Sequence, residues 1–150
     1  MAVITLGQIC NAIAVSLATV PQLLRVQTYT QITEAVHPGD APCARVYMTA
    51  GRCDWQDDTD RATFQAGVRV KQFELVVDVP CQQRIEIAED LTATIDTANA
   101  VEDMLETLQP PFFGVTGVNA LRWEWELFIY EQLGEVDMVG FQLRITVWVF

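Results

Sequence analysis

The chain is short of positively charged side chains, and of lysine above all. Nine basic residues stand against 20 acids, Lys71 is the single lysine, and the net charge is −11. Binding to nucleic acid through phosphates needs a basic stripe, and no stretch of this sequence provides one. Eight of the nine basic residues are arginines, whose planar guanidinium groups favour ion pairs of fixed geometry over diffuse attraction of a charged partner. The charge balance therefore excludes a protein that holds nucleic acid by electrostatic attraction.

Signals for enzymatic chemistry are missing as well. The sequence has no G-x-S-x-G, Walker A, dinucleotide glycine, H-E-x-x-H or EF-hand pattern. His37 is the only histidine and sits in a turn-forming context, and the four cysteines include no C-x-x-C pair. We expect no enzyme, no cofactor and no metal site. The cysteines are expected to be reduced and packed as small hydrophobes, with a Cys43–Cys53 disulfide as the alternative.

A membrane-spanning or exported segment is also missing. The apolar stretch Ile9–Val20 is interrupted by Asn11 and Ser16, and the first positive side chain, Arg25, comes only after it. A signal peptide carries its basic region before the apolar run, and twelve residues are too few to cross a bilayer. We therefore expect a soluble, unexported protein.

The composition that is present is that of one folded domain, residues 1–150. Hydrophobic residues make up 51% and charged ones 19% of the chain. This excludes disorder and leaves a surface poorer in charge than that of most soluble monomers. Some of the surface is expected to be covered by protein.

The first half of the chain predicts one helix and three strands. Apolar residues recur at helical spacing over Leu6–Val20, with Thr5 as N-cap, and strands are expected at Leu24–Ile32, Ala44–Ala50 and Gly67–Val79. The last strand changes phase, either by a bulge near Gln72 or because its halves bury against different partners, and Pro80 is expected to end it. Between the second and third strands, at about 52–66, we expect an exposed acidic loop carrying Asp54, Asp57, Asp58 and Asp60.

The segment from Leu91 to Leu108 predicts a second helix, capped by Asp90 and closed by Pro110 and Pro111. Its apolar side is expected to carry Leu91, Ile95, Ala98, Val101, Leu105 and Leu108. The opposite side carries acids with no compensating base, namely Asp96, Glu102, Asp103 and Glu106. This is either a solvated face or, with the aspartates of the loop, an acidic channel or partner surface.

Two runs of strict alternation close the chain, Leu121–Tyr130 and Phe141–Phe150. Their odd positions, including Trp123 and Trp125, form one apolar face that is expected to join the core. If paired positions sum to 270, Glu126 faces Arg144 and Arg122 faces Trp148. The other face ends in an aromatic patch that a monomer has little use for. We expect a subunit interface formed by Val68, Val70, Phe128, Tyr130, Trp148 and Phe150.

These elements predict an α+β fold, an antiparallel or mixed β-sheet with two helices packed on one face. Their order resembles that of the tail terminator, or tail completion, proteins of long-tailed bacteriophages. The likeness rests on the amphipathic helix Leu6–Val20, the strand ending in Glu74–Val79, the acidic helix Leu91–Leu108, and the closing strand Gly140–Val147.

The resemblance implies a virion protein that forms a ring, typically of six subunits. Such a ring caps the tail tube, ends its polymerisation and joins it to the head-side connector. DNA passes through the channel without specific binding, and acidic walls would repel it. The resemblance implies no enzymatic site, and the expected partners are copies of the chain, the tail tube protein and the connector or stopper protein. Two alternatives stay open: another neck or tail-tube subunit, and a small metal- or ligand-binding domain that uses Asp54–Asp60.

Overall fold

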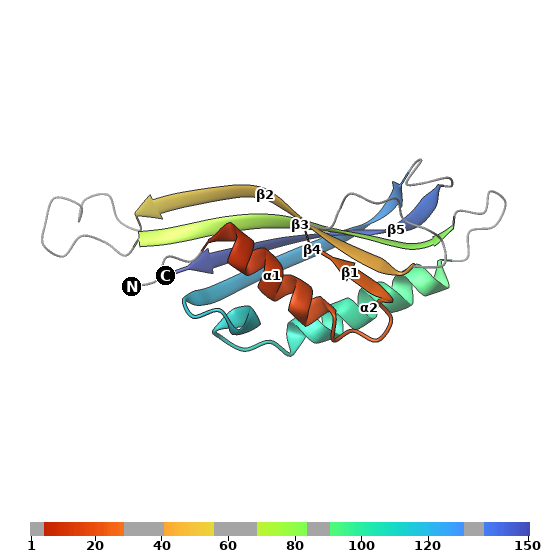
Figure 1. The fold of residues 1–150 in the computed structure, drawn as a ribbon, viewed down its shortest axis with the longest axis horizontal. Helices are drawn as coiled ribbons and strands as arrows, with labels where there is room; N and C mark the ends of the chain where they lie inside the picture. Colours follow the sequence, from red (N-terminus) through yellow and green to blue (C-terminus); the bar gives the residue numbers. More distant parts are fainter. Residues whose placement is uncertain (1–4, 29–40, 56–68, 84–90, 131–136) are drawn as a thin grey trace, which may run out of the picture.

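The fold is that of a computed structural model, which describes residues 5–28, 41–55, 69–83, 91–130 and 137–150. Figure 1 shows one long twisted sheet with both helices on the same side. Along the chain the elements are α1 (Leu6–Leu17), β1 (Arg25–Gln27), β2 (Cys43–Trp55), β3 (Arg69–Gln83), α2 (Thr92–Glu106), the 3-10 helix η3 (Phe112–Gly114), β4 (Val118–Tyr130) and β5 (Met138–Val149). The predicted α+β class is confirmed.

The sheet is mixed and its strand order is β1-β2-β3-β5-β4. The short strand β1 runs parallel to β2, whereas the pairs β2–β3, β3–β5 and β5–β4 are antiparallel. Three strands separate β1 from β4, so these two strands form opposite edges of the sheet. The neighbouring strands β3, β5 and β4 carry most of the alternation of apolar and polar residues that the sequence shows.

The core lies between one face of the sheet and the two helices. On β3 and β5 the odd-numbered residues point to the helices, because successive side chains of a strand alternate between faces. Each large apolar side chain that is fully buried there contributes about 1.5 to 3 kcal/mol to folding. The buried members are Leu75, Val77 and Val79 on β3, Phe141, Leu143, Ile145 and Val147 on β5, Ile9, Cys10, Ile13 and Leu17 on α1, and Ala98, Val101 and Leu105 on α2.

Helix α1 begins as the sequence predicts. The Thr5 hydroxyl accepts a hydrogen bond from the Gln8 backbone N–H at 3.2 Å, and the Gln8 side-chain oxygen accepts one from the Thr5 N–H at 2.8 Å. This capping box satisfies two donors that a helix N-terminus leaves unpaired. The helix ends at Leu17, three residues earlier than predicted, and a turn then buries Val20.

Strands β2 and β3 are longer than predicted, which corrects two boundaries. Residues 52–55, assigned to the acidic loop, continue β2, where Asp54 pairs with Val70. Pro80 does not end β3, since the pairing with β5 resumes at Gln82 after an irregularity between Pro80 and Gln82. An irregularity of this kind lets a strand pass a residue that lacks an N–H. Residues 56–68, the rest of the predicted loop, lie outside the described ranges.

The bulge predicted in β3 near Gln72 is not present. The pairing of β3 with both neighbours is regular there, and the shift lies on β2, between Met48 and Ala50. Val70, Gln72 and Glu74 therefore share the face of the sheet that carries no helix, and Phe73 and Leu75 share the helix face. The predicted strand Leu24–Ile32 is observed as β1, and its residues 29–32 lie outside the described ranges.

Helix α2 confirms the second predicted helix but is rotated from the expected orientation. Its N-cap is Leu91 rather than Asp90, and no side chain caps it. Ile95 is 42% exposed, whereas Thr94 and Thr97 are buried. The Thr94 hydroxyl donates a hydrogen bond to Gln82 Oε1 at 3.3 Å, and the Thr97 hydroxyl donates one to the Ala93 carbonyl at 2.7 Å. Because a bonded hydroxyl removes the cost of burial, threonine can replace isoleucine on the inner side.

The final hairpin has paired positions that sum to 268, not 270. Glu124 faces Arg144 and Arg122 faces Thr146, so the predicted pairing of Arg122 with Trp148 is wrong. The Arg144–Glu126 ion pair nevertheless exists as a diagonal contact at 3.4 Å. Both side chains are more than half exposed, so the pair contributes about 0 to 1 kcal/mol and cannot fix the register. The burial of the odd positions of β5 fixes it instead.

Candidate functional site: the uncovered surfaces of the sheet

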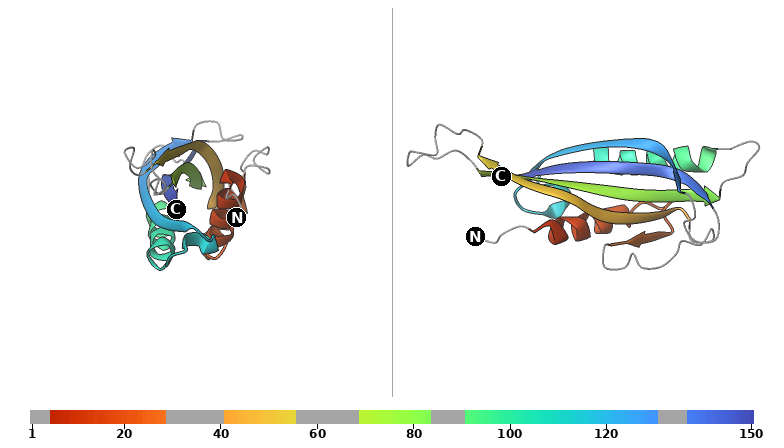
Figure 2. Two further views of the ribbon diagram at one scale, coloured as in Figure 1. Left: turned by 90° about the vertical axis from the view of Figure 1, so that its left-hand side faces the viewer. Right: turned by 90° about the horizontal axis from the view of Figure 1, so that it is seen from above.

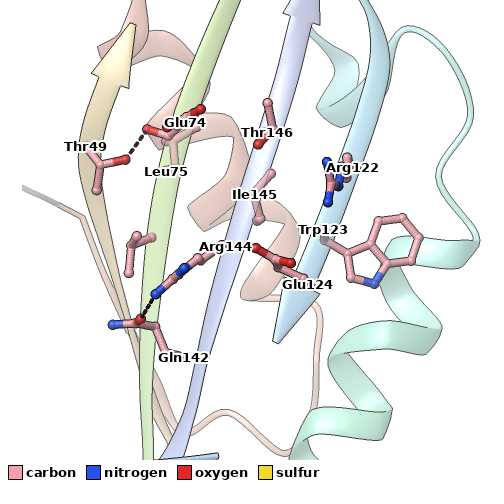
Figure 3. Close-up of a pocket in the computed structure, with 11 residues that line it drawn as sticks. Thr49, Glu74, Leu75, Arg122, Trp123, Glu124, Gln142, Arg144, Ile145 and Thr146 are labelled. Atoms are coloured by element: carbon pink, nitrogen blue, oxygen red, sulfur yellow. Dashed lines mark hydrogen bonds between the residues drawn. The ribbon is translucent and has the colours of Figure 1, made fainter. Parts of the chain in front are cut away.

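The helix-free face of the sheet carries a shallow groove of about 420 Å³. Figure 3 shows side chains of β2, β3, β5 and β4 lining it in a row across the sheet. The guanidinium groups of Arg122 and Arg144 lie among carboxylates of Glu74 and Glu124. The Thr49 hydroxyl donates to the Glu74 carbonyl at 2.7 Å. The groove therefore places arginine and glutamate side chains next to one another on the helix-free face.

One end of the helix-free face is held by a partly buried polar cluster. The Tyr130 hydroxyl donates to the Phe141 carbonyl at 2.8 Å and lies 3.3 Å from Asp78 Oδ1. Gln142 Nε2 donates to the same Asp78 oxygen at 3.1 Å. Burial, and then the Asp78 charge, raise the pKa of Tyr130, so its hydroxyl stays protonated and remains a donor. The cluster joins β3, β4 and β5.

The residues predicted to form the subunit interface fall into different environments. Phe128 and Phe150 are 38% and 53% exposed, and Trp148 and Val70 are half-buried. Tyr130 is only 8% exposed, so it offers a partner little area beyond its ring contact with Phe128 at 4.9 Å. Val68 lies outside the described ranges. Their membership of an interface stays a prediction.

The predicted acidic surface is present on α2 and is only partly described elsewhere. Asp96, Asp103 and Glu106 are exposed, whereas Glu102 accepts a hydrogen bond from the Trp125 indole N–H of β4. Only the backbone of Asp54 is described, and Asp57, Asp58 and Asp60 lie outside the described ranges. Within those ranges, no group of three or more histidines, cysteines and acids could hold a metal ion.

The cysteines are buried where their side chains are described. Cys10, Cys43 and Cys81 carry thiols in the interior. Cys43 and Cys53 lie on the same strand, ten residues apart, which places their Cα atoms about 33 Å apart and excludes a bond between them. Burial raises the pKa of the Cys81 thiol to about 12, and hydrogen bonds with Thr97 and Thr94 oppose the shift only in part. This thiol is therefore not a nucleophile near neutral pH.

Sequence reasoning missed one feature of the surface, the exposed apolar side chains along the margins of the sheet. Leu127 and Ile129 were expected in the core with Trp123 and Trp125, yet they are 48% and 40% exposed. Figure 2 shows that β4 and α2 occupy one side of the molecule and β2 and α1 the other. Alternation gives the face on which a side chain lies, but it does not tell whether its strand is at an edge.

No family model matches the chain, and no curated protein matches it either. No helix in the part of the chain that the structure describes combines the length and the apolarity that crossing a membrane requires.

Proposed function

We propose that the protein is a structural virion component, a tail terminator that forms a ring, with six subunits as the expected number. The ring caps the tail tube, stops its growth and joins it to the head-side connector. Exposed apolar side chains at the margins of an otherwise well-packed domain carry this proposal. Water-exposed Leu127, Phe128 and Ile129 are consecutive on an outer strand, a pattern typical of a surface that another chain covers.

The arrangement of elements supports the choice of this family. The four segments on which the resemblance rests are an N-terminal helix, a long central strand, an acidic helix and a closing strand, and each forms one element of the sheet-and-helix domain. The acidic helix keeps Asp96, Asp103 and Glu106 at the surface. In a ring, exposed carboxylates near the channel would prevent DNA from adhering as it passes.

Electron microscopy of the purified, concentrated protein tests the proposal. We expect rings with an open centre and, in a filter-binding assay at low salt, no retention of duplex DNA. Duplex DNA should not be retained because each subunit carries a net charge of −11, and counterion release favours DNA binding only for basic surfaces. Solid particles without a central opening, or DNA retention at low salt, would contradict the proposal.

A further inference from the structure

Among the described residues, the exposed large apolar side chains other than Phe150 occupy two opposite sides of the molecule. On the β4 side they are Ile95, Leu127, Phe128 and Ile129, with exposed fractions between 38% and 48%. On the side of α1, β1 and β2 they are Val15, Leu24 and Met48, with exposed fractions between 39% and 71%. We call these sets the β4 surface and the β1 surface. A two-fold dimer needs one self-complementary surface, whereas a head-to-tail assembly needs two different ones.

The β4 surface is continuous between helix and strand. Thr94 of α2 bonds to Gln82, which pairs with Val139, and Val139 pairs with Ile129. Farther along α2, Glu102 bonds to Trp125. Ile95 lies seven residues before Glu102, two helical turns away on the same side of α2. It therefore projects toward the same edge, near Ile129, and extends the apolar area from the strand onto the helix.

Leu24 of the β1 surface lies near the same end of the strands as the β4 surface. Leu24 precedes β1, and its N–H donates to the Pro42 carbonyl at 2.8 Å, beside the start of β2. Across the sheet from that point, Arg45 pairs with Asp78, Asp78 with Gln142, and Gln142 with Glu126. Leu24 is thus about level with Leu127 and Phe128. Contacts at equal height let a set of copies close into a ring without rising into a helix.

Charge is distributed unequally between the two sides. Residues 5–28 and 41–51, which include α1, β1 and most of β2, carry two arginines, Arg25 and Arg45, and no acid. Residues 91–130, which include α2 and β4, carry one arginine, Arg122, and the acids Asp96, Glu102, Asp103, Glu106, Glu124 and Glu126. Arg45 is buried and bonds to Gln27, so Arg25 is the exposed arginine of the two. Copies joined through like β4 sides would bring the exposed Glu124 and Glu126 of one copy toward the same acids of the other, whereas copies joined through unlike sides place them against residues that include no acid.

The strand directions suit the same arrangement. The edge strand β1 runs parallel to β2, and three antiparallel steps lead from β2 through β3 and β5 to β4. The two outer strands, β1 and β4, therefore run in opposite directions. Copies in the same orientation therefore bring an outer strand to the next copy in the antiparallel sense, which is the more stable form of pairing.

We propose that the β4 surface of one copy contacts the β1 surface of the next, head to tail, and that this contact closes the ring. That the assembly is a closed ring rests on the proposed function, whereas the contact itself is inferred from the two surfaces. It replaces an interface spread over the strand ends with one made by the two sides of the sheet.

Two variants that each disable one surface test the contact. Val15→Glu with Leu24→Glu blocks the β1 surface, and Leu127→Glu with Ile129→Glu blocks the β4 surface. Glutamate is used on both, so the disabled surfaces repel rather than pair. Gln109→Glu with Thr116→Glu adds the same charge at exposed positions between α2 and β4 and serves as the control. Circular dichroism checks folding, and the single variants Leu24→Glu and Ile95→Glu replace any double variant that does not fold.

Light scattering coupled to size exclusion gives the result. We expect ring-sized mass for the native chain and the control, 16.8 kDa for each blocked variant alone, and twice that mass for their equimolar mixture. The mixture stops at a pair because only one intact surface of each kind remains. Assembly of either blocked variant alone, or a mixture that stays monomeric, overturns the proposal, as does a native chain that is monomeric at every concentration.

The outcomes also separate this contact from the proposed function. If both blocked variants still form open rings, the contact is wrong and the ring stands. If the mixture forms the pair but the native assembly has no central opening, the contact stands and the terminator function fails.

Discussion

Gly140 is the position where one added methyl group should do the most damage to the sheet. It lies on β5 opposite Pro80, beside the irregularity of β3. A Cβ atom at Gly140 would lie 1.9 Å from the Val79 carbonyl oxygen and 2.9 Å from Pro80 Cα. Both atoms belong to the backbone, so no change of rotamer relieves the contact. The strands β3 and β5 have to move apart by more than an ångström to admit it.

We expect Gly140→Ala to lower the free energy of unfolding by about 3 to 6 kcal/mol. Overpacking strain supplies about 1 to 3 kcal/mol, and loss of two or three nearby backbone hydrogen bonds supplies about 1 kcal/mol each. For a chain of 150 residues this corresponds to a fall in Tm of about 10 °C or more. Urea denaturation followed by tryptophan fluorescence measures the change, because Trp123 and Trp125 pack against the core.

The matched control is Gly51→Ala, on β2 of the same sheet. Its new Cβ would meet only the Phe73 ring, at 3.3 Å, and a side chain can yield. The loss there should be below about 1 kcal/mol, since the substitution also restricts the unfolded chain. Equal stability of Gly140→Ala and the native chain would refute the close approach of β3 and β5 near Pro80.

Three further predictions concern single side chains. Tyr130→Phe removes the hydroxyl that bonds to the Phe141 carbonyl and Asp78, so the free energy of unfolding in urea should fall by about 1 to 2 kcal/mol; no loss would contradict the cluster. With its pKa raised to about 12, Cys81 should carry thiolate in about one molecule in 10,000 at pH 8, and peptide mapping after brief iodoacetamide treatment should find it unmodified until urea is added. Phe150→Ala, at a 53% exposed ring outside both contact surfaces, should change the unfolding free energy by less than about 0.5 kcal/mol and leave the concentration dependence of the mass unchanged; weaker assembly would place part of the contact at the strand ends instead.

The fold class could be predicted because alternation and helical spacing are strong in this chain. The odd positions of Phe141–Val147 are all buried, and Thr5 caps α1 through Gln8 as its spacing indicates. The strand boundaries could not be predicted. Pro80 and the residues around Asp54 have poor strand propensity, and tertiary pairing with β5 and between β2 and β3 overrides it.

The candidate surfaces were harder to predict than the core. Leu127 and Ile129 have the same alternation as Trp123 and Trp125, yet β4 ends the sheet and α2 covers only part of it. Edge position depends on strand order, which no local pattern contains. The predicted hairpin register was wrong by two residues because it was based on the Arg144–Glu126 ion pair. This pair is exposed, and it also forms when the two residues are diagonal neighbours on adjacent strands.

A ring of identical subunits has a defined mass, so the molar mass of the native chain in solution shows whether the protein assembles. Light scattering over a range of concentrations up to the millimolar level gives this mass without a label. We expect a species several times heavier than the 16.8 kDa subunit, with one dominant mass that does not grow further as the concentration rises. A mass of 16.8 kDa at every concentration, or a mass that keeps increasing, would contradict it.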